Sequence, residues 1–277
     1  MGLRINTNVQ SLSAQRLLQK TNNNLKNNLR KLSSGQRITR AADDAAGLAI
    51  SENLKSNIRS IRQAKRNADD GISLIQTAEG GLQEISNIII RLRELSVQSA
   101  TDTVGPDERS FSNIEFEQLK NEIQRISLSS EFNGRKLLDG TEGLLEFQIG
   151  YRNDPFNDRI SFDSMETVST LESLGLSGEG VSSKEGAQMA LSKLDDALLQ
   201  VNGSRANLGA LQNRLTSIIQ NLGVTEENFS EANSRIRDVD VAAETAAMTK
   251  NQILTQAGIS VLAQANQAPN FALKLLG

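Results

Sequence analysis

Apolar residues recur every seven positions over two long stretches of the chain. In the first half the repeat is formed by Leu54, Ile61, Ala68, Ile75, Leu82 and Ile89, with Ile58, Ile72, Ile85 and Leu92 at companion positions. Such a seam is typical of helices that pack as a coiled coil. No proline precedes Pro106, and Asp43 and Asp44 offer side-chain oxygens for an N-cap. The pattern therefore predicts one helix over residues 43–100, roughly 85 Å long at about 1.5 Å per residue.

The second stretch repeats more regularly and predicts a helix over residues 185–237. Its seam consists of Leu194, Val201, Leu208, Leu215, Leu222, Phe229 and Ile236. Between the two stretches, spacings of three and four relate Phe116, Leu119, Ile123 and Ile126, after a start at Gly105-Pro106. These predict a shorter antiparallel helix over residues 106–129. The expected fold is mainly α, an elongated antiparallel coiled-coil bundle formed by the N- and C-terminal halves.

Residues 131–182 have a different composition, rich in Gly, Ser, Asn and Asp. Leu145, Phe147 and Ile149 alternate with polar residues, as do Ile160 and Phe162, and the turn sequence Asn153-Asp154-Pro155 lies between them. Alternation on both sides of a turn predicts a β-hairpin. A small β-hairpin region within a loop is therefore expected between the second and third helices.

The two ends of the chain carry thin apolar stripes. The N-terminal stripe consists of Val9, Leu12, Leu18, Leu25, Leu29 and Leu32, and the C-terminal stripe of Ile253, Ala257, Val261, Leu262, Phe271, Leu273 and Leu275. Stripes this narrow stabilise an isolated helix weakly. We expect the two ends to lie together and to become well ordered when neighbouring copies cover them.

Composition argues against catalysis by the common side-chain machinery. The chain contains no histidine, cysteine or tryptophan, which removes imidazole bases, thiol nucleophiles and His/Cys metal sites. The acidic pairs Asp43/Asp44, Asp69/Asp70 and Asp195/Asp196 consist of helix neighbours that point about 100° apart, so capping or solvated roles are favoured over metal binding. Gly175 to Gly180 lacks the context of a phosphate loop and is interpreted as a flexible linker. We expect no catalytic residue, cofactor or metal, and therefore no enzyme.

Charge and hydropathy exclude two classes of partner. The net charge is −3, which gives no general attraction for nucleic acid or anionic lipid. The basic N-terminal segment is interpreted as a polar wall rather than a membrane or nucleic-acid arm, because it is crowded with Asn and the chain has few aromatic residues. The longest apolar run, residues 45–50, is too short for a membrane span or the core of a signal peptide.

Several long motifs, in order, resemble bacterial flagellins. They are "MGLRINTNVQSLSAQRLL" at the start, "LSSGQRITRAADDAAGLAISE" at 32–52, "RNADDGISLIQTAEGGLQEISNI" at 66–88, "RLRELSVQSA" at 91–100, "EFNGRKLLDG" at 131–140 and "VLAQANQAPNFALKLLG" at the close. The resemblance implies a structural subunit that self-assembles into the flagellar filament for swimming motility. Residues 1–42 with 238–277 would form the inner-tube terminal domain, and residues 43–237 the rod domain, without the family's variable outer domains.

The same resemblance implies the protein's location and its partners. The expected location is the extracellular filament, reached by type III export without a cleaved signal peptide. Besides itself, alone or mixed with sister flagellins, the expected partners are an export chaperone and the cap and hook-junction proteins.

The family also has a surface recognised by Toll-like receptor 5, and the residues that match it are Arg91, Leu95 and Glu115. Alternatively, Leu95 packs in the core, while Arg91 and Glu115 are solvated or pair within the filament. A hook-filament junction protein, with similar termini, is the second functional hypothesis, and heptads alone fit any coiled-coil structural protein.

Overall fold

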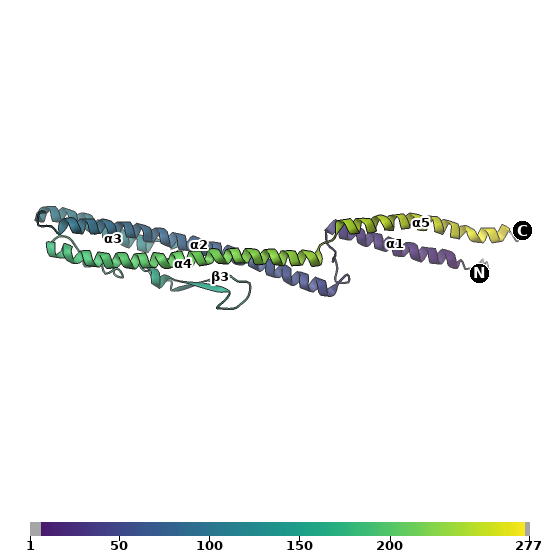
Figure 1. Cartoon of the computed structure of the whole chain (residues 1–277), viewed down its shortest axis with the longest axis horizontal. Helices are drawn as coiled ribbons and strands as arrows, with labels where there is room; N and C mark the ends of the chain where they lie inside the picture. The colour runs from purple at the N-terminus through teal and green to yellow at the C-terminus, as the bar shows by residue number, and fades with distance from the viewer. Residues whose placement is uncertain (1–6, 275–277) are drawn as a thin grey trace. The chain divides into compact units, whose positions relative to one another are not determined.

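The computed structural model describes the backbone of residues 7–274 and the side chains of residues 7–267. Five α-helices dominate the chain: α1 (Val9–Ser34), α2 (Ala45–Ser99), α3 (Pro106–Ser129), α4 (Lys184–Arg237) and α5 (Val241–Lys274). Four short strands and a 3-10 helix lie between α3 and α4: β1 (Glu131–Phe132), β2 (Arg135–Lys136), β3 (Leu144–Gln148), β4 (Arg159–Asp163) and η1 (Ser164–Thr167). Figure 1 labels the helices. The three helices predicted from the heptads are confirmed, with α3 as predicted and the starts of α2 and α4 within two residues.

The chain divides into two compact units. One contains both ends of the chain, as far as Asn57 and again from Glu227, and the other is Ile58–Glu226. We call them the terminal unit and the central unit. The boundaries expected at residues 42 and 238 for an inner-tube domain stay a prediction, because a division by compactness does not show which residues line a channel.

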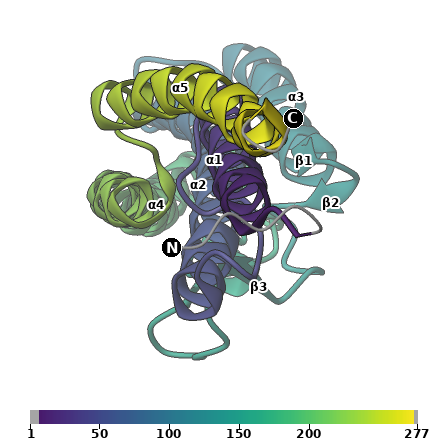
Figure 2. The ribbon, with the colours of Figure 1, turned by 90° about the vertical axis from the view of Figure 1, so that its right-hand side faces the viewer.

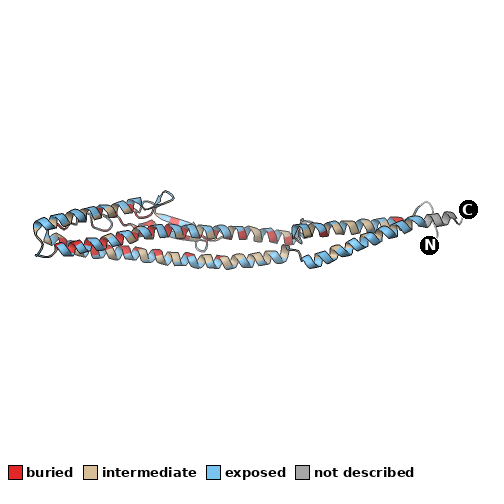
Figure 3. Cartoon of the chain, turned by 90° about the horizontal axis from the view of Figure 1, so that it is seen from above, coloured by how far each residue is buried: buried red, intermediate tan, exposed pale blue. Residues whose placement is uncertain are grey.

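The heptad positions form the core of the central unit. Buried members of the two seams include Ile61, Ala68, Ile75, Leu82, Ile85, Ile89 and Leu92 of α2, and Leu194, Val201, Leu208 and Leu215 of α4. From α3, Phe116 and Ile123 are fully buried, while Leu119 and Ile126 are partly buried. In Figure 3 the buried residues gather along this unit, whereas α1 and α5 are mostly exposed. The hydrophobic effect thus stabilises the central unit far more than the terminal one.

The predicted hairpin is confirmed and a second, smaller one accompanies it. Strand β3 pairs antiparallel with β4, placing Leu145 opposite Phe162 and Phe147 opposite Ile160. Strands β1 and β2 pair around Asn133-Gly134, and both turn residues have positive φ, 52° and 78°. An Asn-Gly turn of this kind favours a two-residue hairpin. The prediction of a single hairpin was therefore incomplete, because strands of two residues carry no alternation that a sequence pattern can reveal.

One face of α3 holds the irregular segment between η1 and α4. Lys120 is 4% exposed, and its ammonium donates to the carbonyl of Glu179 at 2.7 Å and lies 3.4 Å from that of Ser177. Gln124 accepts from the backbone N–H of Leu171 at 3.0 Å, and Asn113 accepts from that of Val181 at 2.9 Å. Gly175 to Gly180, interpreted as a linker, is thus bound to α3 by Lys120, and Gln124 and Asn113 bind the chain on either side of it.

A charge cluster joins α2 to α4 and gives the central unit a predicted acid sensitivity. Arg62 donates to Glu226 at 2.7 Å and Lys65 at 3.3 Å. The hydrogen bond from Arg62, followed by that from Lys65, holds the pKa of Glu226 below its ordinary value of 4.5. A carboxyl with a depressed pKa contributes stability that is fully present above its unfolded pKa and is lost as the pH falls through its folded pKa.

We expect Glu226→Gln to lower the melting temperature at about pH 7 and to reduce the difference between melts at about pH 7 and about pH 3. The exposed neighbour Glu227 supplies the control, because Glu227→Gln makes the same charge change away from this pair of cations. Thermal denaturation followed by circular dichroism measures both variants. Equal pH dependence in Glu226→Gln and the unaltered chain would contradict this assignment.

Candidate functional site: the terminal helix pair

Helices α1 and α5 lie side by side in the terminal unit, as Figures 1 and 2 both show. The seam between them combines side-chain hydrogen bonds with half-buried leucines. Asn8 donates to the carbonyl of Ala265 at 2.7 Å, and Ser11 donates to the amide oxygen of Asn266 at 2.7 Å. The prediction that the two ends of the chain lie together is confirmed, and hydrogen bonds join them.

Farther along, Asn28 is the centre of the same seam. Its amide donates to Glu244 at 2.6 Å and accepts from Asn251 at 2.9 Å, while Lys31 lies 3.8 Å from Glu244. Between these contacts Leu18 packs on Gly258, where an added Cβ would come within 3.2 Å of the Leu18 side chain. Each buried amide therefore has a partner across the seam, which specifies the register of the two helices.

The predicted apolar stripes divide between the seam and the outer surface. Half-buried members are Leu18, Leu25, Leu32 and Leu262, whereas exposed members are Val9, Leu12, Leu29, Ile253, Ala257 and Val261. Of the remaining predicted residues, Phe271 lies in α5 beyond the described side chains, as does Leu273, and Leu275 lies outside the described residues. Six of the predicted side chains thus face away from the partner helix of their own chain.

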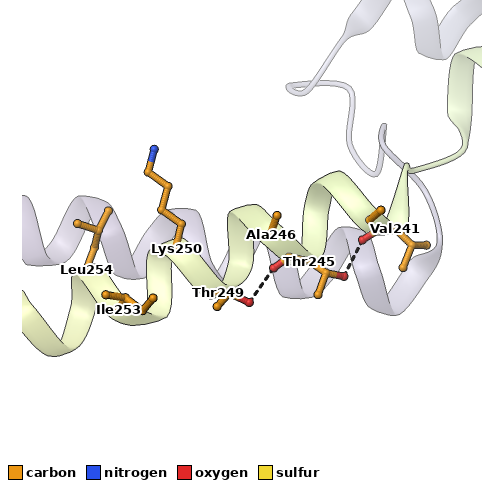
Figure 4. Close-up of a pocket in the computed structure, with 8 residues that line it drawn as sticks. Val241, Thr245, Ala246, Thr249, Lys250, Ile253 and Leu254 are labelled. Carbon is orange, nitrogen blue, oxygen red and sulfur yellow. Dashed lines mark hydrogen bonds between the residues drawn. The ribbon is translucent and has the colours of Figure 1, made fainter.

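The outer face of α5 is continuous and nearly uncharged. Figure 4 shows it from Val241 to Leu254, with Lys250 as its charged member. Thr245 and Thr249 donate their hydroxyls to the carbonyls four residues earlier, at 2.6 and 3.0 Å, so their polarity is satisfied within the helix. With Ile253 at 60% exposure, this face presents apolar surface that no part of the described chain covers.

Several residues of these faces are not among the positions predicted from the sequence. They are Leu17 of α1 and Val241, Leu254 and Ile259 of α5, all exposed. Leu17, Leu254 and Ile259 each lie next to a predicted position or within one turn of it, so a wider stripe of about 100° would have included them. Val241 lies more than three turns before Ile253, the first predicted position of α5.

Two linkers join these helices to α2 and α4 and are themselves bridged. The backbone N–H of Arg37 donates to the carbonyl of Arg237 at 2.7 Å, and that of Val239 donates to Gly35 at 3.1 Å. Beside the bridge, Ile38 is 2% exposed and packs on Gly47, where a Cβ would lie within 2.8 Å of it. The ends of α1 and α4 are therefore fixed to each other by backbone hydrogen bonds.

The acidic pair Asp43/Asp44 fixes the start of α2. Asp43 accepts from the Thr39 hydroxyl at 2.9 Å and from the backbone N–H of Thr39 and Arg40, and the hydroxyl bond is the main reason that its pKa is lowered. Asp44 accepts from the backbone N–H of Gly47 at 2.9 Å. The two carboxylates serve different groups: Asp44 has the predicted capping role, whereas Asp43 binds the residues that precede the helix.

The residues expected to form a receptor surface differ in exposure. Arg91 is exposed and pairs with Glu115 and Glu94, each at 2.9 Å, and these hydrogen bonds, that of Glu94 first, raise its pKa. Leu95 is 2% exposed and belongs to the central core. Residues four apart lie about 40° apart on a helix, enough to place one at the surface and the other in the core. The structure therefore brings Arg91 and Glu115 together and separates Leu95 from them.

No helix within residues 7–274 has both the length and the hydrophobicity that a membrane span requires.

Comparisons with known proteins agree along nearly the whole chain. The model of the bacterial flagellin N-terminal helical region matches residues 5–143, and that of the C-terminal helical region matches residues 191–276. The chain is 44% identical to a flagellin of Halalkalibacterium halodurans and 42% identical to the flagellar filament 30.7 kDa core protein of Treponema maltophilum. Each alignment covers 98% of this chain and 99% of the relative. The crystal structure of Bacillus cereus flagellin matches with a TM-score of 0.51 at 30% identity, over 57% of this chain and 88% of that one.

Proposed function

This chain belongs to the bacterial flagellin family and is a structural subunit of the flagellar filament; we propose that it polymerises through the outward apolar faces of α1 and α5. The supporting observation is the division of side chains in the terminal unit. Hydrogen-bonded polar groups and four half-buried leucines fill the seam within one copy, whereas other large apolar side chains, among them Val9, Leu12, Ile253 and Val261, are exposed. An uncovered apolar face of this length is typical of a surface that another protein covers.

Assembly supplies the free energy that the terminal unit lacks alone. Two helices whose seam holds hydrogen bonds and only half-buried leucines bury little apolar surface to offset the entropy of ordering them. When a neighbouring copy covers Val241 to Leu254, that surface leaves water and the pair gains stability. Ordering coupled to association in this way confines polymerisation to a growing end, where several neighbours are already in place.

A filament also requires contacts between copies that do not form a closed oligomer. A two-fold dimer would cover the same patch on both copies and stop, whereas a patch that meets a different patch on the next copy propagates. Helices α1 and α5 offer two different outer faces, one with Val9 and Leu12 and one with Ile253 and Val261. We propose that these faces meet between copies.

The names of the relatives favour a filament subunit over a hook-filament junction protein, since they read flagellin and filament core protein. We further propose export through the flagellar type III apparatus without a cleaved signal peptide. We propose an export chaperone, the cap and the hook-junction proteins as its partners. We also propose that the chain has no enzymatic activity.

The experiment that tests the assignment incubates purified chain with short filament seeds. We expect the seeds to lengthen in proportion to added subunit, as measured by electron microscopy. If the seeds keep their length and also fail to elongate when a second flagellin is added, the chain is a capping or junction protein.

For receptor recognition, we propose that Arg91 and Glu115 contribute contacts and that Leu95 acts through packing. We expect Arg91→Ala to weaken binding to Toll-like receptor 5 without lowering the melting temperature. Leu95→Ala should lower the free energy of unfolding by roughly 2 kcal/mol or more. Surface plasmon resonance and thermal melts measure the two effects. Unchanged receptor binding by Arg91→Ala would contradict the proposal that Arg91 contacts the receptor.

A further inference from the structure

The most deeply buried side chains of α1 are polar. Within this helix, which the structure describes throughout, the two buried residues are Ser11 and Asn28, 7% and 9% exposed. Both donate hydrogen bonds across the seam to α5. The leucines that share the seam, Leu18, Leu25 and Leu32, are only half-buried. The seam therefore covers hydrogen-bonding groups more completely than it covers apolar ones.

Helix α5 turns the less apolar of its two faces toward α1. Half-buried residues recur along that inner face every seven positions, and they are Glu244, Asn251, Gly258 and Ala265. Ile253 follows Asn251 by two positions, which places it about 200° round the helix, and it is exposed. Burial of apolar surface alone would favour the opposite arrangement, with Ile253 against the leucines of α1. A further interaction must therefore orient α5.

Asn28 is the side chain that distinguishes the two faces of α5. Its amide donates to Glu244 at 2.6 Å and accepts from Asn251 at 2.9 Å, and both partners lie on the inner face. The polar groups of the outer face are Thr245 and Thr249 beside this level, and each hydroxyl already bonds a carbonyl of its own helix. With the outer face turned inward, Asn28 would lose a carboxylate and an amide while staying buried, which is costly.

We propose that Asn28 is a positioning residue for polymerisation, because its bonds to α5 hold the polar face inward and leave the apolar face free for a neighbouring copy. This role rests on the proposed function and adds the residue that orients its contact surface. Asn28 lies three positions after Leu25 and four before Leu32, so an apolar side chain there would complete a continuous stripe on α1. Helix α5 would then bury Ile253 within its own chain, and the polymerisation surface would be lost.

Asn28→Leu tests this role, because it should strengthen the helix pair of the monomer and weaken assembly at the same time. If about nine-tenths of the chains hold Ile253 inward, the critical concentration for seed elongation rises roughly tenfold. Hydrogen exchange of α1 and α5 in the monomer should become slower, since the pair buries more apolar surface. Asn24→Leu is the matched control, with the same change at an exposed position of α1. It should leave exchange in the monomer unchanged and elongate seeds much better than Asn28→Leu.

Disulfides within one chain report which face of α5 is inward, because the chain has no cysteine of its own. A Cβ added at Gly258 would lie 4.0 Å from that of Leu18, a separation that suits a disulfide, so Leu18→Cys with Gly258→Cys reports the observed orientation. Leu25→Cys with Thr249→Cys reports the opposite one, since Thr249 lies on the outer face (Figure 4). We expect chains that keep Asn28 to form the first disulfide, and chains with Asn28→Leu to form mainly the second.

The first disulfide also supplies a rescue. In chains with Asn28→Leu, oxidation of the pair at positions 18 and 258 holds the polar face inward, so seed elongation should recover and be lost again when a reductant opens the bond. The same disulfide should not hinder elongation by chains that keep Asn28.

Three results would overturn this role of Asn28 and leave the proposed function intact. They are normal elongation by Asn28→Leu, faster exchange of its α1 and α5 in the monomer, and a loss of elongation that the disulfide does not restore. The last two would show a helix pair that is merely destabilised. Failure of the unaltered chain to elongate seeds would overturn the proposed function instead, while the two disulfides would still report the orientation of α5 in the monomer.

Discussion

Deleting residues 1–30 is expected to abolish seed elongation while leaving the central unit folded. The deletion removes most of α1, with the outward Val9, Leu12 and Leu29, and exposes the polar inner face of α5. None of residues 7–30, the described part of this segment, belongs to the central core. Circular dichroism should show a cooperative melt of the remaining helices, and electron microscopy should show seeds of unchanged length. Normal elongation by the truncated chain would refute the role of the terminal pair.

A single substitution on α5 sharpens this prediction. Ile253→Asp places a carboxylate on the outer apolar face, where a neighbouring copy would bury it, and should raise the critical concentration roughly 100-fold or more. Gln252→Asp is the matched control, since it adds the same charge at the adjacent exposed position without removing an apolar side chain. We expect the control to elongate seeds much better than Ile253→Asp does. Equal loss in both variants would show that charge, and not the apolar face, is responsible.

The second large effect concerns the stability of the central unit. Phe116→Ala is expected to lower the free energy of unfolding by about 3–5 kcal/mol, because Phe116 is fully buried among the seams of α2 and α4 and its loss leaves a cavity. For a unit of this size the melting temperature should fall by roughly 10 °C. Differential scanning calorimetry measures both quantities.

Phe111→Ala provides the control for this variant, because Phe111 lies on the same helix and is 71% exposed. Its loss should change the unfolding free energy by about 0.5 kcal/mol or less. A similar loss in both variants would mean that the core described for α3 is wrong.

Sequence patterns predicted the central unit well because burial there follows a strict repeat. Positions such as Ile75 and Leu208 are fixed by a seven-residue period that only helix packing satisfies. The β3–β4 hairpin was predictable for the same reason, since alternation around a turn has a period of two. The β1–β2 hairpin and the docking of the segment near Glu179 onto Lys120 leave no periodic signal, because each depends on a few specific hydrogen bonds.

The terminal unit was only partly predictable from the sequence. The two terminal segments were identified and their pairing was expected. An apolar stripe in a sequence, however, does not show whether its side chains face a partner helix or solvent. In α5 the inner face is formed by residues such as Asn251 and Thr255, whose hydrogen bonds a hydropathy pattern does not register. The exposed Ile253 and Val261 were therefore predicted as residues of the polymerisation site without their outward direction.

Hydrogen exchange tests most directly whether neighbouring copies cover the outward apolar faces of α1 and α5 in the filament. Peptides from α1 and α5 are compared by mass spectrometry in the monomer and in the filament, with peptides from the core of the central unit as the internal reference. We expect α1 and α5 amides to exchange at least roughly 100-fold more slowly in the filament, while the reference peptides change little. Equal exchange of α1 and α5 in monomer and filament would contradict the account.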